Sequence, residues 1–482
     1  MPGRSAALRI GFAVLVLAAL AAAITSRPAK RLVDFDQIFY VTMAHDLVHH
    51  GVFANGIFDQ VAGSRAPPPP GMFFAPLYPL VIAGVMRLDP GLARSIDCAV
   101  AADERRQDLG GCPIDTTSML LLHALLLAGA ALAIGRTGEI ATGDARVFYG
   151  AAALATVGFA AEADLLSFLM TESLSIATFS LYGLALVAAL ARWRLADFVA
   201  LGLALGLACL TRPTFLILAP VTLVMIAVVG RWFAGPERRA LLRPAFAVAA
   251  ALAVMLAPWL VRNAVSVGKL GFTEEYGSVA LIERFAFNTM TPREYFWAFP
   301  ACVPDVGPPL VAALAGPDAT ARFQWDAPGS FFETGRARRN ALIAEHGRLD
   351  PVIGAITRDA MADGGWWRHL AVSVPLAWCG LWVAGLFALV VLPLAAIGLV
   401  RAARRGRPLV IAYAVPALLL VGVHGVLANH YPRYNLGLIG PMSVAAAWLV
   451  SDALARRRAA PARPPRPRGS APPGPSRPGS PR

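Results

Sequence analysis

The sequence predicts an all-α polytopic membrane protein. The chain has 482 residues, of which 57% are hydrophobic. Its mean hydropathy of +0.58 is far above the range of soluble globular proteins. Apolar runs near the ~20 residues that cross a bilayer recur along the chain. Short arginine clusters follow many of these runs, as the positive-inside rule describes for cytoplasmic loops. Together these observations predict a bundle of about ten transmembrane helices.

The first transmembrane helix is predicted over residues 6–25, where an uninterrupted apolar run has the length of a bilayer crossing. Arg4 and Arg9 precede this run, and the small residues at 21–23 resemble a signal-peptide cleavage site. Because more membrane sequence follows instead of a soluble domain, we interpret the run as an uncleaved helix. In either case, Asp34 comes directly after the first crossing and lies outside.

Two interfacial helices are predicted in the first outer loop, which covers residues 26–118. The stretch 36–50 is amphipathic and is expected to lie flat on the membrane surface. The apolar stretch 76–88 would be only about 20 Å long, too short for the ~30 Å hydrocarbon core. If it did cross, later arginine clusters, including the one at Arg401, would lie outside against the positive-inside rule.

The polar side of the first interfacial helix carries two histidines. His45 and His49 have the i, i+4 spacing of zinc ligands on a helix. A solvated polar face is nevertheless the simpler interpretation of this pattern. The other predicted members of that solvated face are Thr42 and Asp46.

The remaining spans alternate across the membrane and place both termini in the cytoplasm. They are predicted over residues 119–134, 145–160, 171–190, 198–210, 214–229, 246–260, 378–400, 408–427 and 436–454. The chain thus divides into an N-terminal transmembrane module with the first outer loop (1–262), an outer segment (263–368), C-terminal transmembrane helices (369–458) and a disordered, basic, proline-rich cytoplasmic tail (459–482).

The cysteines fall into two kinds of surroundings. Cys98 and Cys112 flank a polar stretch of the first outer loop and would form a disulfide in an oxidising compartment. Cys209 and Cys379 lie inside apolar runs and are interpreted as packing residues.

The charge pattern argues against nucleic-acid binding. The net charge is +13, but it lies in short runs between apolar stretches, and no soluble domain carries it as a patch. The sequence also shows no Walker loop, dinucleotide fingerprint or cysteine-based metal motif.

The predicted topology brings charged residues to one membrane face. Three of them are acids: Asp34, Asp36 and Glu172. An acid can act as the base toward an incoming hydroxyl, and the pair Asp34 and Asp36 could hold a divalent metal such as Mg²⁺ or Mn²⁺. Arginine guanidinium groups match the oxygens of a lipid phosphate. The other candidate substrate-binding residues at this face are Arg212, Arg262, Asn263, His430, Arg433 and Tyr434.

These pieces resemble the GT-C glycosyltransferase superfamily, in particular its protein-O-mannosyltransferase-like branch (family 39 type), which includes the aminoarabinose transferases of lipid A. The resemblance rests on the order and spacing of several segments rather than on one motif. They are Asp34-Phe35-Asp36 with Tyr40, Ala44 and Gly51, the segment 76–80, Met170-Thr171-Glu172, the segments 206–213 and 258–263, and Arg433-Tyr434.

The resemblance implies a GT-C-like helical bundle that transfers a sugar, with inversion, from a polyprenyl-phosphate donor. It implies a site on the periplasmic face of the bacterial inner (plasma) membrane and an acceptor that is a glycan, a lipid or a protein. The family's first-loop acid carries over to Asp36 as base or metal ligand, with Asp34 as its partner and Glu172 as a second acid. Arg212, Arg262 and Arg433 carry over as donor-phosphate contacts. The family often has an acid after the first-loop Asp, where this chain has Gln37, so metal dependence stays open.

Other interpretations exist for each feature. Asp34 and Asp36 could serve as helix N-caps, and Glu172 could be an acid favoured by the dipole of the following helix. For the whole chain, the alternative function is a non-enzymatic flippase or transporter of lipid-linked sugars. Such proteins usually contain internal repeats with broken helices, and the sequence shows none. A catalytically inactive assembly subunit would not need the three acids.

Overall fold

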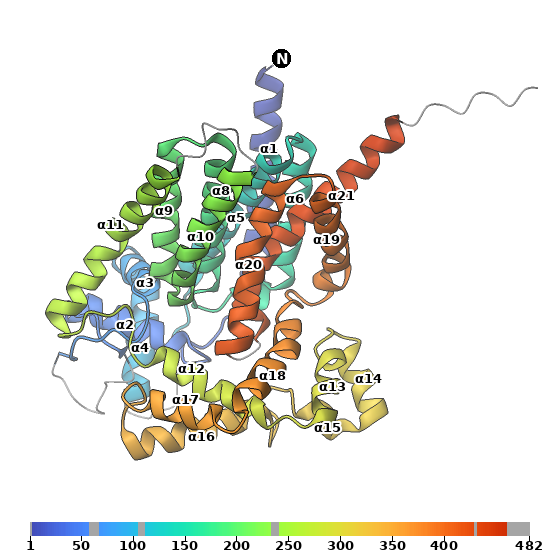
Figure 1. Cartoon of the computed structure of the whole chain (residues 1–482). Helices are drawn as coiled ribbons and strands as arrows, with labels where there is room; N and C mark the ends of the chain where they lie inside the picture. Colours follow the sequence, from blue (N-terminus) through green and yellow to red (C-terminus); the bar gives the residue numbers. More distant parts are fainter. Residues whose placement is uncertain (1, 57–66, 105–110, 233–240, 429–430, 460–482) are drawn as a thin grey trace, which may run out of the picture.

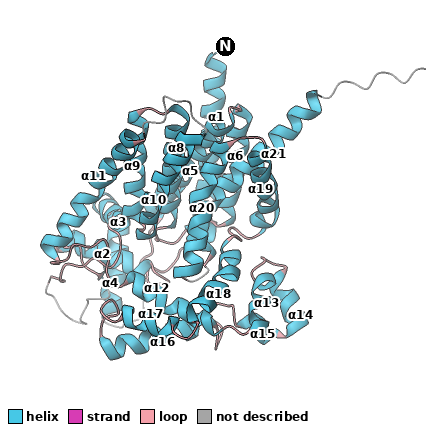
Figure 2. Cartoon of the chain, in the orientation of Figure 1, coloured by secondary structure: helices cyan, strands magenta, loops and turns pink. Residues whose placement is uncertain are grey.

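The computed structural model describes residues 2–56, 67–104, 111–232, 241–428 and 431–459. Apart from turns and loops, this part of the chain consists of helices only (Figure 2). Within it, eight helices are long and apolar enough to cross a membrane. Two more bundle helices, α6 and α9, have 17 residues each. The fold class predicted from the sequence, an all-α polytopic membrane protein, is therefore confirmed for the described part of the chain.

The bundle contains most of the long apolar helices, which alternate in direction. They are α1 (Pro2–Thr25), α5 (Thr117–Thr142), α6 (Ala145–Ala161), α8 (Glu172–Arg192), α9 (Leu195–Thr211), α10 (Leu218–Trp232), α11 (Leu242–Ser266), α19 (Leu386–Arg404), α20 (Pro408–Leu427) and α21 (Ile439–Ala459). Short helical turns between them are α7 (Ala163–Leu166), η3 (Pro213–Ile217) and η6 (Pro432–Leu438).

Two groups of shorter helices cover one end of the bundle, opposite to the end where α1 begins (Figure 1). The first outer loop forms α2 (Gln37–His49), α3 (Leu77–Leu88) and α4 (Pro90–Glu104). The second group, which we call the cap, is formed by α12 (Tyr276–Phe285), η5 (Ala286–Thr289), α13 (Pro292–Ala301), α14 (Gly307–Ala315), α15 (Pro317–Ala321), α16 (Phe331–His346), α17 (Ile353–Met361) and α18 (Gly365–Gly380).

The bundle, the first outer loop and the cap each contribute to a separate buried apolar cluster. The largest lies between the bundle helices, and a smaller one lies within the cap. The third joins the first outer loop to the bundle: Met43 and Tyr78 of the loop pack in one cluster with Met170 before α8 and Trp259 of α11. The first outer loop is thus fastened to the ends of the transmembrane helices.

The first outer loop differs from its prediction in two ways. The polar side of α2 was expected to face solvent, but Thr42 and Asp46 are buried, because α3 and α4 pack against α2. The helix α4 was not predicted. It begins before Cys98 and extends into the stretch between Cys98 and Cys112 that was interpreted as a polar loop. Its apolar residues Leu92 and Ile96 are buried.

The span predicted over residues 378–400 is not a single helix. The helix α18 ends at Gly380 and α19 begins at Leu386. Between them, Ala384 and Gly385 have φ values of 60° and 54°, which a right-handed helix cannot include. Hydropathy alone does not reveal this break, because the linking residues are themselves apolar.

Candidate active site

Four charged residues meet at the end of the bundle that the first outer loop and the cap cover. Asp36 comes directly before α2, Glu172 begins α8, Arg212 lies between α9 and η3, and Arg433 belongs to η6. Asp36 Oδ2 lies 2.6 Å from Arg433 Nη2, and Arg433 Nη1 lies 3.9 Å from Glu172 Oε1. The same Oε1 lies 2.8 Å from Arg212 Nη2. Acids and guanidinium groups therefore alternate, and their formal charges cancel.

The two arginines owe their positions to neighbouring prolines. Arg212 precedes Pro213, and its φ of −140° and ψ of 125° are extended, because a residue before proline avoids the helical region. This ends α9 and directs the chain into η3. Arg433 directly follows Pro432, the first residue of η6. One proline thus follows Arg212 at the end of α9, and the other precedes Arg433 at the start of η6.

Asp36 is held by the residue that follows it. The Gln37 side chain is fully buried. Its Nε2 donates to the carbonyl oxygens of Arg31 at 2.9 Å and Asp34 at 3.1 Å. Its Oε1 accepts a hydrogen bond from the Leu169 backbone N–H at 2.7 Å. Gln37 therefore ties the turn that carries Asp36 to the segment that leads to Glu172.

Two buried polar atoms at the site lack a partner within the described residues: Glu172 Oε2 and Arg433 Nε. The Glu172 side chain is 4% exposed and the Arg212 side chain is 14% exposed. A buried polar atom without a hydrogen bond is costly. Such atoms therefore indicate a place where a polar ligand would find partners.

Two cavities share Glu172, Arg212, Arg433 and Tyr434 as lining residues. The first is lined mainly by polar and charged residues. Its other lining residues include Asp36, Tyr40, Thr171 and Tyr276. The second extends among apolar side chains of the bundle. These include Ile176, Phe179, Phe215, Ala417, Leu420 and Leu436. The charged residues therefore separate a polar chamber from an apolar one.

Sequence reasoning did not assign Tyr40 and Tyr276 to the site. Burial raises the pKa of the Tyr40 hydroxyl well above its usual value, and the charge of Asp36 adds to this effect. Burial likewise raises the pKa of Tyr276. Both phenols are therefore neutral near pH 7 and can donate a hydrogen bond. Tyr40 follows Asp36 by one helical turn, a spacing that could have identified it, whereas Tyr276 lies in the cap, far along the chain.

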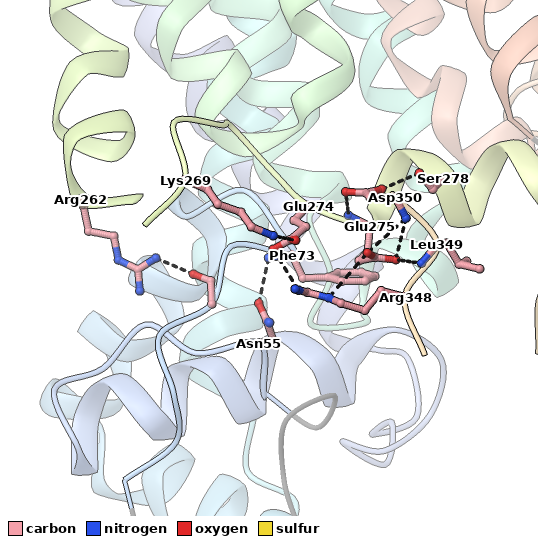
Figure 3. A network of polar contacts seen from close by, with 11 residues as sticks. Asn55, Phe73, Arg262, Lys269, Glu274, Glu275, Ser278, Arg348, Leu349 and Asp350 are labelled. Carbon is pink, nitrogen blue, oxygen red and sulfur yellow. Dashed lines mark hydrogen bonds and ion pairs between the residues drawn. The ribbon is translucent and has the colours of Figure 1, made fainter. Parts of the chain in front are cut away.

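A network of polar contacts fixes the cap segment that contains Tyr276 (Figure 3). Glu275 accepts a hydrogen bond from the Leu349 N–H at 2.6 Å, and its own N–H donates to Asp350 Oδ2 at 2.8 Å. Glu274 forms ion pairs with Lys269 and Arg348. This network joins the linker after α11 to the turn before α17, immediately beside Tyr276.

Several predicted site residues do not line either cavity. Arg262 donates to the backbone carbonyl oxygens of Phe53 and Gly71 and lies over the rings of Phe53 and Trp259. Figure 3 shows Arg262 near the end of α11. Asn263 donates to the Gly271 carbonyl oxygen at 2.9 Å. Both residues fasten loops to the end of α11. His430 lies outside the described residues.

Asp34 also lies apart from the cavities, although it is only two residues from Asp36. Its Oδ1 accepts hydrogen bonds from Arg31 at 2.9 and 3.2 Å. The intervening Phe35 has a φ of 54°, a left-handed conformation that turns the chain between the two acids. Asp34 and Asp36 each engage a different arginine, so they do not fit the predicted Mg²⁺ or Mn²⁺ site.

The structure contains two disulfides within its described residues. Cys98 pairs with Cys112, as predicted for an oxidising compartment. Cys302 pairs with Cys379, so the interpretation of Cys379 as a packing residue is wrong. The apolar sequence around Cys379 gave no sign of its partner, which lies between α13 and α14 of the cap. Cys209 is free and buried, as expected.

Comparisons with known proteins define the fold class. No protein-family model matches the chain, and no curated protein sequence matches it. The structure is similar to that of the archaeal oligosaccharyltransferase AglB from Archaeoglobus fulgidus, solved in complex with an inhibitory peptide and a dolichol-phosphate. The TM-score is 0.50 and the sequence identity 14%, and the match covers 93% of this chain and 51% of AglB. The chain thus spans about half the length of AglB, and the likeness establishes the fold.

Proposed function

We propose that this chain is a glycosyltransferase that moves a sugar from a polyprenyl-phosphate-linked donor to an acceptor. The observation that carries the proposal is the pair of cavities that share two arginines and Glu172. A lipid phosphate sugar has a polar head, an anionic phosphate and an apolar tail in that order. The polar chamber, the arginines and the apolar chamber follow the same order. AglB, which has the same fold class, was solved with a dolichol-phosphate.

In this proposal Arg212 and Arg433 bind the donor phosphate. Guanidinium groups stay charged in partly buried surroundings and bind phosphate oxygens through paired hydrogen bonds. Both are paired with acids, Arg212 with Glu172 and Arg433 with Asp36. A phosphate would replace Asp36 as the partner of Arg433 and would bring its own negative charge to the unpartnered Nε.

Asp36 is the proposed base. Its Oδ2 accepts from Arg433, and the side chain is 39% exposed, so an acceptor hydroxyl can reach it. The acceptor oxygen attacks the anomeric carbon while its proton passes to Asp36. The bond between that carbon and the phosphate oxygen breaks, and the electron pair leaves with the polyprenyl phosphate, which the two arginines stabilise. Attack from the side opposite to the leaving group inverts the anomeric configuration.

We further propose that the site faces the periplasm of a bacterial inner (plasma) membrane, with the termini in the cytoplasm. Cys98–Cys112 and Cys302–Cys379 lie in the first outer loop and the cap, which cover the end of the bundle where the site lies. Disulfides persist in oxidising compartments. The arginine cluster Arg456–Arg458 ends α21, at the other end of the bundle, where the positive-inside rule expects the cytoplasm. The acceptor is a glycan, a lipid or a protein.

The substitution Asp36→Asn tests the proposal. The purified full-length protein, reconstituted in proteoliposomes, would receive radiolabelled polyprenyl-phosphate hexose or pentose and envelope extract as acceptor. Release of polyprenyl phosphate and labelling of the extract would be measured. Removal of a general base should lower the rate by about 10²–10⁴-fold.

Asp34→Asn is the matched control, because this acid is paired with Arg31 outside the cavities. It should retain nearly the wild-type rate. Equal loss in both variants would point to a structural role for the loop. Unchanged transfer by Asp36→Asn would refute the assignment of the base. Flipping of the labelled lipid without any transfer by the wild type would favour the transporter alternative.

A further inference from the structure

A cluster of metal-ligating side chains lies at the end of α2 away from Asp36. It consists of His45 and His49 on α2 and Asp97 on α4. One ligand atom from each residue lies within 4.8 Å of the other two. His49 Nε2 is 2.9 Å from Asp97 Oδ1, and His45 Nε2 is 3.8 Å from the same oxygen. Ligand atoms of a tetrahedral zinc ion lie about 3.4 Å apart, given bonds of about 2.0–2.2 Å. Both printed distances to Asp97 Oδ1 therefore lie within about 0.5 Å of the spacing that a single zinc ion requires.

The second ring nitrogen of His45 also has the surroundings of a metal ligand. His45 Nδ1 faces the Asp46 carboxylate at 3.8 Å, and Asp46 is only 3% exposed. Neither His45 Nδ1 nor Asp46 Oδ2 has a hydrogen-bond partner among the described residues. Histidines that bind a metal usually direct the other ring nitrogen to a carboxylate, which fixes the tautomer. A cation on Nε2 would make Nδ1 a donor toward Asp46.

The fold holds the two halves of this cluster in place. The residues His45 and His49 are one helical turn apart, and their ring centroids are 4.4 Å apart. Asp97 is adjacent to Cys98, which is joined to Cys112. The helices α2 and α4 pack against each other. Ligands on two rigid, packed elements lose little freedom when they bind an ion.

We propose that His45, His49 and Asp97 bind one divalent cation of the zinc class, with water as the fourth ligand. The ion would fasten α2 to α4. Two imidazole nitrogens and one carboxylate suit zinc better than magnesium or calcium, which prefer oxygen ligands. The site is separate from the cavities at Asp36 and does not depend on the proposed sugar transfer.

Zinc binding to the full-length protein tests this proposal. The protein would be purified in detergent with a tag that contains no histidine, stripped with a chelator, and equilibrated with Zn²⁺. Its metal content would be measured by mass spectrometry and its affinity by calorimetry. We expect one Zn²⁺ per chain and a higher unfolding temperature with Zn²⁺. Retention of no zinc by the wild type would show that the cluster is an ordinary histidine–aspartate pair.

Variants locate the ion. His49→Gln and Asp97→Asn should each weaken Zn²⁺ binding at least tenfold, since even changes behind the ligands commonly have effects of that size. They should also abolish the rise in unfolding temperature. His50→Gln is the matched control, because His50 is a neighbouring exposed histidine outside the cluster. Zinc binding that is equally strong in all variants would overturn the assignment.

A spectroscopic measurement on the wild type avoids dependence on variant folding. Co²⁺ can replace Zn²⁺, and a tetrahedral site with nitrogen ligands gives it intense visible absorption. We expect these bands to appear with one equivalent of Co²⁺ and to disappear when Zn²⁺ is added. Weak bands typical of octahedral Co²⁺ would refute the proposed coordination.

Discussion

Glu172 holds two arginines near a single carboxylate oxygen, one at 2.8 Å and one at 3.9 Å. A buried carboxylate stabilises a protein less through the attraction itself than by neutralising cations that would otherwise be buried without a partner. Removing it would leave the positive charges of Arg212 and Arg433 without a nearby buried acid. The site would then contain excess positive charge even before substrate arrives.

Glu172→Ala is therefore expected to destabilise the protein by about 3–5 kcal/mol, the usual result of breaking a buried ion pair from one side. Glu172→Gln keeps an oxygen that can accept from Arg212 and should have a smaller effect. Denaturant unfolding in detergent would measure the difference. Glu345→Ala is the control, since the Glu345 side chain is 69% exposed. An unfolding midpoint that does not move in Glu172→Ala would contradict this account.

The two acids of the first outer loop, Asp34 and Asp36, do not form the joint site that their spacing predicts. Their spacing in the sequence suggests one joint site, and the sequence does place them beside the membrane. The left-handed backbone at Phe35 separates them, so that Asp36 reaches Arg433 whereas Asp34 reaches Arg31. Positive φ at a phenylalanine has no sequence signature, because it is imposed by the packing around it.

At the scale of elements, the start of α2 links the candidate site to the transmembrane bundle. Its first residue, Gln37, is bonded to the turn before it and to the segment before α8. An amide at this position supplies both the donor and the acceptor that these bonds require. A carboxylate at this position could not donate to the two carbonyl oxygens.

We predict that Gln37→Glu lowers stability by about 1–3 kcal/mol, the penalty for buried polar groups left without a partner. It should also slow transfer, because Asp36 shifts with the turn. Unfolding curves and the transfer assay would be compared with Gln324→Glu, an exposed position in the cap. If Gln37→Glu matched the wild type in both measurements, Gln37 would not anchor the turn.

The bundle elements could be predicted well from the sequence, because each span is a continuous apolar run that the bilayer requires to be helical. The irregular elements could not. The break between α18 and α19 and the helix α4 depend on the residues packed around them rather than on hydropathy. The same is true of the site: Arg212 and Arg433 were identified beside prolines, whereas Tyr276 depends on how the cap folds back.

The whole molecule has two chemically different ends. The disulfides and the site lie at one end, and the arginine-rich ends of α19 and α21 lie at the other. This polarity is what the proposed orientation requires.

Cysteine labelling tests the orientation. Ala337→Cys on α16 and Ala403→Cys at the end of α19 both create an exposed thiol. A membrane-impermeant maleimide, applied to cells whose outer membrane has been permeabilised, should label only the Ala337→Cys variant. Both should react once the inner membrane is lysed. Labelling of Ala403→Cys in cells with an intact inner membrane would reverse the proposed topology.

The sequence by itself determined that this chain crosses a membrane many times and gathers acids and arginines beside it, because hydropathy and helix-breaking prolines act locally. Only the tertiary structure decided which charges meet. Asp36 and Arg433 are separated by 397 positions in the chain, and their contact depends on how the first outer loop docks onto the last hairpin. Arg262, which looked equivalent in sequence, was drawn instead to the backbone carbonyls of that loop. Such pairings are set by the summed packing of distant segments, which local sequence patterns do not record.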